Sequence, residues 1–280
     1  MRLSQARGEW ALVTGASSGI GAEFCVQLAA AGMNLVLVAR RKERLDALAE
    51  ELSKQHGVRA LVLTVDLSKP RAAETVQGAV RQAGIRIRLL INNAAFGLWG
   101  RFEKTAAEEY ERMLQLVAAA PISLCRVFLE DLTTFPSSVI INVSSPAAFQ
   151  PMPFKAVYGA AKICLHHFSL ALYEEWKERG VQVQTLVPGP TRSEMDVKGG
   201  AYKCRLTEER RPPAEVVKRA LACMGRDLPV VATSKGVYRQ RVFAGVFPTK
   251  IVTRTAAWMF RPAAETKSRT GAKSKVGVSR

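Results

Sequence analysis

Seven short runs of aliphatic and β-branched residues recur along the chain and are separated by longer amphipathic stretches. Most runs are apolar at every position rather than at alternate positions, which is typical of strands buried on both faces of a parallel sheet. The runs are 10–14, 35–39, 61–65, 89–92, 139–143, 181–187 and 229–232. The amphipathic stretches are 20–31, 41–55, 71–83, 106–131, 156–179 and 213–224. This alternation predicts one α/β domain on a doubly wound parallel sheet of about seven strands, with helices on both faces.

Residues at the ends of the amphipathic stretches support these boundaries. Gly57 and Gly180 follow predicted helices at the position where glycine commonly ends a helix. Thr105, with Glu108 three residues later, has the pattern of a capping box. The sequence therefore predicts that the fourth helix begins at this point.

A glycine-rich loop, TGASSGIG, joins the first strand to the first helix. Glycines at this spacing allow a tight turn, let backbone N–H groups approach a pyrophosphate, and let the helix pack close to the sheet. The N-terminus of the helix adds partial positive charge. The pattern predicts a Rossmann-type dinucleotide site. Its loop residues are Gly15, Ser17, Ser18, Gly19, Ile20 and Gly21.

Arg40 and Arg41 follow the second strand, where an NAD site has an acid for the ribose 2′-hydroxyl. A carboxylate would repel a 2′-phosphate, whereas a guanidinium binds it through bidentate, charge-assisted hydrogen bonds. The two arginines therefore favour NADP(H) over NAD(H). The alternative interpretation is a solvated, basic start of the second helix.

The net charge of +17 is unevenly distributed. Residues 235–280 carry eleven Lys and Arg against one Glu, so the first 234 residues are only mildly basic. A nucleic-acid-binding protein should carry a basic stripe on its folded body together with a recognisable motif. No such motif is visible, and we expect no specific nucleic-acid partner.

The five cysteines form no CxxC pair and no metal-ligand spacing, which favours reduced thiols in the cytoplasm. The first ten residues lack the apolar region of a signal peptide, and no run of 18 apolar residues occurs. The sequence therefore predicts neither secretion nor a membrane span. His166 and His167 lack a third ligand, so we interpret them as a helix-surface pair and expect no metal.

Four motifs in this order resemble the short-chain dehydrogenase/reductase family over residues 9–225, and within it the bacterial NADP-dependent 3-oxoacyl or ketone reductases. The motifs are Gly15–Gly21, Asn92–Ala95, Ser145 and Tyr158–Lys162. The resemblance implies a homodimer or homotetramer. It also implies cofactor contacts at the adenine, the adenine ribose and the nicotinamide. The residues at those positions are Asp66 with Leu67, Asn93 with Ala94, and Pro188, Gly189, Thr191 and Ser193. Ala95 replaces the usual glycine, and its methyl group could crowd the cofactor.

Hydride transfer to a ketone leaves alkoxide character on the oxygen, so the site needs a proton donor and a hydrogen-bond partner. Tyr158 suits the donor, and Lys162, one helical turn later, lies on the same face. A nearby ammonium and the positive charge of nicotinamide have the sign that lowers a tyrosine pKa. By resemblance, Ser145 binds the substrate carbonyl and Lys162 also holds the nicotinamide ribose. Ser144 is the alternative serine, but its side chain should point the other way.

One position departs from the family. Its fourth helix carries an asparagine 28 residues before the catalytic serine, where this chain has Val117. In the family that residue helps hold a water connecting the lysine to solvent. Pro121 stands four residues later and has no N–H, so the Val117 carbonyl should leave the helical ladder and accept a hydrogen bond from water. We expect the kinked backbone to maintain the relay without the amide side chain.

Two segments bear on substrate and partners. Residues 190–211 mix Met195, Val197 and Tyr202 with Lys198, Lys203 and Arg205, around a hinge-like Gly199–Gly200. This mixture would suit an apolar ketone or an acyl group on an anionic carrier. Residues 237–260 alternate aromatic and aliphatic residues with cations and predict two short helices broken at Pro248. This extension is interpreted as a flap over the substrate cleft, a subunit contact, or a peripheral surface for anionic membranes.

The sequence thus predicts three parts: a Rossmann-type catalytic domain (1–234), an amphipathic helical extension (235–262) and a disordered basic tail (263–280). The predicted activity is an NADP(H)-dependent interconversion of a ketone and a secondary alcohol, in the cytoplasm or at a membrane surface. Ser145, Tyr158 and Lys162 would carry the chemistry. The alternative is a cofactor-binding protein with a non-catalytic, membrane-surface or regulatory role.

Overall fold

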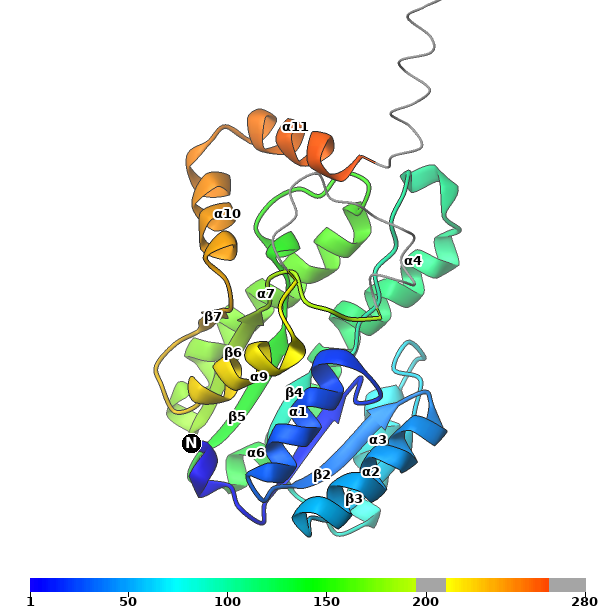
Figure 1. Cartoon of the computed structure of the whole chain (residues 1–280), viewed down its shortest axis with the longest axis vertical. Helices are drawn as coiled ribbons and strands as arrows, with labels where there is room; N and C mark the ends of the chain where they lie inside the picture. Colours follow the sequence, from blue (N-terminus) through cyan, green and yellow to red (C-terminus); the bar gives the residue numbers. More distant parts are fainter. Residues whose placement is uncertain (195–209, 262–280) are drawn as a thin grey trace, which may run out of the picture.

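The computed structural model describes residues 1–194 and 210–261. Its centre is a seven-stranded parallel sheet in the order β3-β2-β1-β4-β5-β6-β7 (Figure 1). The strands are β1 (Trp10–Thr14), β2 (Asn34–Ala39), β3 (Ala60–Thr64), β4 (Ile87–Asn92), β5 (Ser138–Val143), β6 (Val181–Val187) and β7 (Val230–Ala232). Each bound lies within two residues of the run that predicted it, so the doubly wound parallel sheet is confirmed.

The strand order reverses at the centre of the sheet. β1 pairs with β2 on one side and with β4 on the other, so successive crossovers leave this pair in opposite directions. Ligands of open α/β sheets bind in the crevice at such a switch point, beyond the carboxyl ends of the strands. Here that crevice lies beyond Thr14 at the end of β1 and Asn92 at the end of β4.

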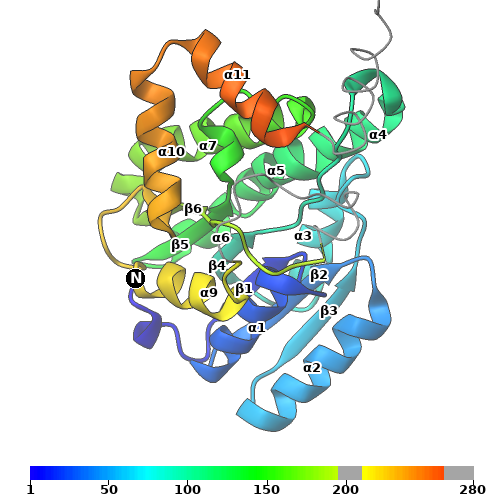
Figure 2. The same ribbon diagram turned by 45° about the horizontal axis from the view of Figure 1, so that its top comes forward.

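Helices cover both faces of the sheet, and each face has its own apolar core (Figures 1 and 2). One face is covered by α1 (Gly19–Ala30), α2 (Lys42–His56) and α9 (Pro213–Ala222). The other is covered by α3 (Ala72–Gln82), α5 (Ala120–Val127), α6 (Leu129–Thr134) and α7 (Ala156–Glu175). Because both faces are covered, the central strands are apolar at nearly every position, as their sequences predict.

The fourth helix, predicted over 106–131 with a kink near Val117, is divided into several elements. The chain instead forms α4 (Ala107–Leu114), a π-helical turn η3 (Gln115–Ala119), α5 and α6. The N–H of Ala120 donates to the carbonyl of Gln115, five residues back, and Pro121 has no N–H to donate to Val117. The capping box is also absent: Ala106 is the N-cap, and no side chain caps the helix.

The C-terminal extension forms the two short helices that its sequence predicts, α10 (Lys235–Val246) and α11 (Thr249–Phe260), with the break at Pro248. α10 lies beside the turn η4 (Pro146–Ala148), where Gln240 donates to the carbonyl of Pro146 over 3.0 Å. α11 crosses above α7 (Figure 2). No helix among the described residues is long and apolar enough to span a bilayer. The predicted basic tail, 263–280, lies outside the described residues.

Candidate active site

The glycine loop packs directly against the end of β4. Gly15 has a φ of +67°, and a Cβ built on it would lie 2.8 Å from Asn93 Nδ2. A Cβ on Gly21 would lie 2.2 Å from the Gly15 carbonyl oxygen. Both positions therefore require glycine, one for its backbone conformation and one for the close approach of α1 to the loop. The loop leaves the N-terminus of α1 facing the crevice.

Thr14 joins the loop to the residues that follow β4. Its Oγ1 accepts hydrogen bonds from the backbone N–H of Asn93 at 2.9 Å and of Ala94 at 3.0 Å. Asn93 Nδ2 donates back to the Thr14 carbonyl at 2.9 Å. These bonds bring Asn93 and Ala94 beside the glycine loop, where the sequence expects the adenine ribose. Ala95 packs in the apolar cluster around Tyr158.

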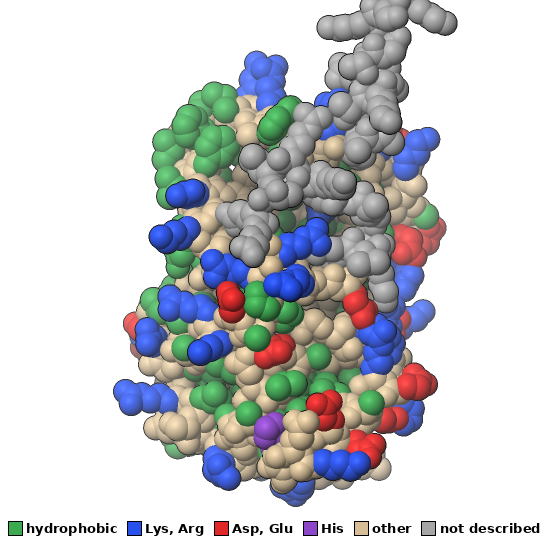
Figure 3. Space-filling view, in the orientation of Figure 1, with side chains coloured by type: hydrophobic (Ala, Val, Ile, Leu, Met, Phe, Trp, Pro, Cys, Tyr) green, Lys and Arg blue, Asp and Glu red, His purple; other side chains and the backbone are tan. Residues whose placement is uncertain are grey.

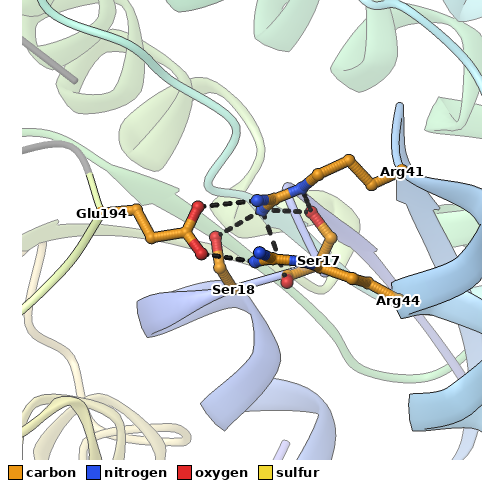
Figure 4. Close-up of polar contacts among 5 residues, drawn as sticks. All are labelled: Ser17, Ser18, Arg41, Arg44 and Glu194. Atoms are coloured by element: carbon orange, nitrogen blue, oxygen red, sulfur yellow. Dashed lines mark hydrogen bonds and ion pairs between the residues drawn. The ribbon is translucent and has the colours of Figure 1, made fainter. Parts of the chain in front are cut away.

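Arg41, rather than Arg40, lies on the glycine loop. Arg41 Nη2 donates to the hydroxyl oxygens of Ser17 and Ser18, each over 2.8 Å (Figure 4). The Arg40 side chain is 58% exposed, and its Nη1 lies 4.0 Å from Asp66 Oδ2. Arg41 is the N-cap of α2, and its guanidinium is partly buried and hydrogen-bonded to the glycine loop.

Asp66 follows β3 and is held by Ser68, whose N–H and hydroxyl donate to Asp66 Oδ1 at 3.0 and 2.7 Å. Partial burial alone would raise the pKa of Asp66, but these bonds and the nearby Arg40 and Arg112 hold it below its usual range. The carboxylate therefore stays ionised at the rim of the crevice. Leu67 beside it is buried.

The loop after β6 closes the crevice from the opposite side. Gly189 N–H donates to Thr233 Oγ1 at 3.0 Å, and Thr191 Oγ1 donates to the Gly189 carbonyl at 2.8 Å. Ser193 lies beside Gly19, since a Cβ built there would be 3.5 Å from Ser193 Cβ. This loop, which begins at Pro188, thus reaches the N-terminus of α1. The predicted substrate residues between Met195 and Arg205 lie outside the described residues.

Tyr158 and Lys162 lie one turn apart on α7, and both side chains are buried. Lys162 Nζ donates to the Val143 carbonyl at 2.7 Å and lies 5.8 Å from the centroid of the Tyr158 ring. Burial lowers the pKa of Lys162 to about 7. Tyr158 packs in an apolar cluster with Val117 of η3 and Ala147 of η4. The phenol thus lies among apolar groups, and the buried amine beside its ring is held by a backbone carbonyl. Charges interact strongly at buried positions of this kind.

Ser145 is the N-cap of η4, and its hydroxyl accepts a hydrogen bond from the Ala147 N–H at 3.2 Å. Ser144 is buried, and its hydroxyl donates to the Lys162 carbonyl on α7 at 3.5 Å. The two neighbouring serines therefore make separate contacts, as the alternation of a strand predicts. Because Ala147 and Tyr158 share one cluster, η4 holds Ser145 on the same side of the sheet as Tyr158.

Sequence reasoning missed two residues of the Arg41 cluster. Arg44 and Glu194 both join it (Figure 4), although they lie 150 residues apart in the chain. Arg44 could have been found, because it lies one helical turn after Arg40 and Arg41. No local pattern marks Glu194. Phe260 of α11 packs against the Tyr158 cluster, with its ring 6.0 Å from that of Trp99.

The histidine pair is partly mispredicted. His167 is exposed, but His166 is buried beside Phe149 at a ring separation of 5.2 Å. Burial, His167 and Arg241 lower the pKa of His166 to about 4. Among the described residues, no group of three or more His, Cys, Asp or Glu side chains could hold a metal ion.

The chain is similar in sequence and in fold to known proteins. Residues 9–201 match the family described as short chain dehydrogenase. The chain is 31% identical to a 7beta-hydroxysteroid dehydrogenase of Collinsella aerofaciens over 83% of its own length and 89% of that protein. It is 28% identical to a very-long-chain 3-oxoacyl-CoA reductase of Bos taurus over 78% of its length and 69% of that protein. A short-chain dehydrogenase from Sphingobium yanoikuyae, solved with NADPH, is 31% identical with a TM-score of 0.76, and the match covers 97% of both chains.

Proposed function

The chain belongs to the short-chain dehydrogenase family, and we propose that it is an NADP(H)-dependent oxidoreductase that interconverts a ketone and a secondary alcohol. The observation that supports the proposal is that Tyr158 and Lys162 are buried one turn apart on α7, with Lys162 bonded to the carbonyl of Val143 at the carboxyl end of β5. The bound nicotinamide would supply or accept the hydride.

In this proposal the protein's own residues handle the proton and orient the carbonyl. Tyr158 donates the proton to the developing alkoxide in the reductive direction, and Ser145 donates a hydrogen bond to the same oxygen. The Lys162 ammonium lies close enough to favour the ionised phenol. The apolar cluster around Tyr158 excludes water and thereby strengthens these interactions.

The glycine loop fits a dinucleotide pyrophosphate. Ser18 does not cap α1 with its side chain; its hydroxyl instead accepts from Arg41. The first N–H groups of α1 can therefore donate to an anion. We propose that the remaining predicted contacts, from Asp66 to Ser193, hold the rest of the cofactor. The NADPH bound to the Sphingobium protein and the position of Arg41 both favour NADP(H).

For the substrate we propose a bulky apolar ketone or an acyl chain. Phe260 and Trp99 add aromatic area to the apolar cluster that includes Tyr158, so the reacting carbonyl would be surrounded by hydrocarbon. The two named relatives are described by a steroid and a very-long-chain acyl substrate, which have the same apolar character. The inner face of α11 then serves as part of a flap.

The test is turnover by the Tyr158→Phe variant. We expect NADPH oxidation with 3-oxoacyl thioesters, aliphatic ketones, aryl ketones or steroids in the wild type. In the variant we expect loss of kcat by at least about a thousandfold, with the Kd of NADPH unchanged. Retained turnover would refute the role of Tyr158. NADPH binding without turnover of any substrate by the wild type would favour the non-catalytic alternative.

A second candidate role rests on the outer face of the extension. Tyr238, Val242 and Val246 lie four residues apart on α10 and are exposed. α11 exposes Ile251 and Trp258. Residues 235–261 carry six cations and no acid, and Figure 3 shows apolar side chains gathered over the two helices. We propose that this outer face contacts anionic lipid, because apolar insertion and cationic attraction then act together.

Co-sedimentation of the full chain with vesicles tests the lipid contact. We expect binding to phosphatidylglycerol vesicles that weakens in high salt, little binding to phosphatidylcholine, and loss of binding in Val246→Asp. Truncation after Pro262 separates the contribution of the predicted tail. No binding by the full chain, together with a Val246→Asp variant that changes oligomeric state, would identify the face as a subunit contact.

We further propose that the protein is a homodimer or homotetramer located in the cytoplasm. The proposed domain limits are 1–234, 235–262 and 263–280. β7 ends at Ala232, and the Ser234 hydroxyl accepts from the N–H of Val237, capping α10. These features support a boundary near residue 234.

A further inference from the structure

Glu194 belongs to a polar cluster with Arg41 and Arg44, which follow the end of β2. Its Oε2 accepts from Arg41 Nη1 at 2.6 Å, and its Oε1 pairs with Arg44 Nη1. Ser17 and Ser18 complete the cluster through Arg41 (Figure 4). Three separate segments thus meet in this cluster: the glycine loop, the start of α2 and the segment after β6.

The cluster has the composition of a site for a phosphate. Two guanidiniums and two hydroxyls supply charge-assisted and neutral donors, and arginine is well suited to bidentate binding of phosphate. In the described part of the chain, Glu194 is the only carboxylate paired with Arg41 or Arg44. The two arginines hold the pKa of Glu194 at about 2, so the group is an anion at every working pH.

Resting on the proposed use of NADP(H), we propose that Glu194 sets cofactor selectivity by competing with the 2′-phosphate for Arg41 and Arg44. Both carboxylate oxygens engage the donors that the phosphate would use. A phosphate monoester carries about −1.5 to −2 charges at pH 7 and three acceptor oxygens, so it displaces the single carboxylate. A carboxylate left beside a bound phosphate would repel it.

The competition applies to one cofactor only. NAD(H) has no 2′-phosphate, so its binding leaves the Glu194 ion pairs in place. Glu194 therefore lowers the affinity for NADP(H) and changes the affinity for NAD(H) little. As a result, it reduces the preference of the protein for NADP(H) over NAD(H). Its neighbour Ser193 lies beside Gly19 at the start of α1, so the backbone of this segment follows the cofactor crevice.

The test is the affinity of full-length Glu194→Gln for NADPH, NADH and 2′,5′-ADP, measured by calorimetry. Glutamine keeps the shape and removes the charge. Because the variant loses two partly exposed ion pairs, we expect its Kd for NADPH and for 2′,5′-ADP to be about three- to tenfold lower than in the wild type. Its Kd for NADH should stay within about twofold of the wild-type value. In an Arg44→Ala background Glu194 has lost one partner, so Glu194→Gln should increase the affinity for NADPH by a smaller factor.

Asp46→Asn is the matched control, because it removes one carboxylate from α2 that pairs with Lys42 rather than with the cluster. Equal tightening in this control would overturn the proposal in favour of a general charge effect. Weaker NADPH binding by Glu194→Gln would also overturn it, since Glu194 would then clamp the cofactor. If the wild type bound neither NADPH nor 2′,5′-ADP, the cofactor proposal itself would fail together with this one.

Discussion

At the scale of single residues, burial separates the side chains that we propose for chemistry from those that we propose for cofactor recognition. Lys162 and Tyr158 are buried in α7, where burial lowers the pKa of the lysine. Arg41 and Arg44 lie at the rim of the crevice and remain partly exposed. Buried groups interact strongly with one another, whereas rim groups can exchange one anion for another.

The two adjacent arginines give a residue-scale prediction. Arg41→Ala should raise the KM for NADPH about tenfold to a hundredfold, because charge-assisted hydrogen bonds to the 2′-phosphate are lost. Arg40→Ala should raise it less, because the Arg40 side chain is largely exposed and directed toward Asp66. Steady-state kinetics with NADPH and NADH measures both effects. Equal increases in KM for the two cofactors would contradict the assignment of Arg41.

Local patterns and long-range contacts differ in how well the sequence predicts them. The glycine loop and the Tyr158–Lys162 pair were predictable because each is set by spacing within one loop or one helix. The pairing of Arg44 with Glu194 was not, because it joins residues 150 positions apart. The burial of His166 was also missed, because it depends on the later helix α10, whose Arg241 lies near Phe149.

At the scale of elements, the helix predicted over 106–131 is divided close to the residues where Pro121 predicts a disturbed hydrogen-bond ladder. The amphipathic pattern runs through residues 106–131 and does not indicate a change in backbone hydrogen bonding. Pro121 indicates that change, but the sequence did not predict its π-helical form or the separate helices α5 and α6. The π-helical turn puts the Val117 side chain in the Tyr158 cluster. The N–H of Ala120 reaches Gln115, and Pro121 has none, so the Leu116 and Val117 carbonyls lack their usual donors from four residues ahead.

This turn yields an element-scale prediction. Pro121→Ala supplies an N–H that can bond to the Val117 carbonyl and restore regular α-helix. We expect kcat to fall about tenfold, because the carbonyl no longer accepts a hydrogen bond from water in the proton relay. Val117→Asn should leave kcat equal or raised. Single-turnover and steady-state kinetics compare the variants. An unchanged kcat in a folded Pro121→Ala protein would contradict a role of the Val117 carbonyl in the proton relay.

At the scale of the whole molecule, α10 packs against η4 and the aromatic side chain of Phe149 next to it. Gln240 bonds to the carbonyl of Pro146, and Arg241 lies 5.9 Å from the Phe149 ring. His166 is buried beneath this contact, and its Nδ1 has no hydrogen-bond partner among the described residues. A protonated imidazole would therefore be poorly solvated there.

The burial of His166 predicts a pH dependence of stability. Its folded pKa of about 4 is below the unfolded value of about 6.5, so the unfolded chain binds the proton more readily. Stability present above pH 6.5 is lost as the pH falls toward 4. Between pH 7 and pH 5 the free energy of unfolding should fall by about 2 kcal/mol.

Urea titration at the two pH values measures this loss. His166→Leu should remove most of it, whereas His167→Gln should retain it, because His167 is exposed. If His166→Leu lost as much unfolding free energy between pH 7 and pH 5 as the wild type, the pH dependence would belong to other groups.

The position of Phe260 in the chain has a consequence for synthesis on the ribosome. Every strand of the sheet is complete by Ala232, and the nascent chain can fold from its N-terminal side as it emerges. The aromatic contact between Phe260 and Trp99 forms only after α11 has followed. During translation the sheet can therefore assemble first, while the apolar cluster around Tyr158 still lacks Phe260. Until α11 has followed, this apolar surface is open to contacts with other proteins, including chaperones.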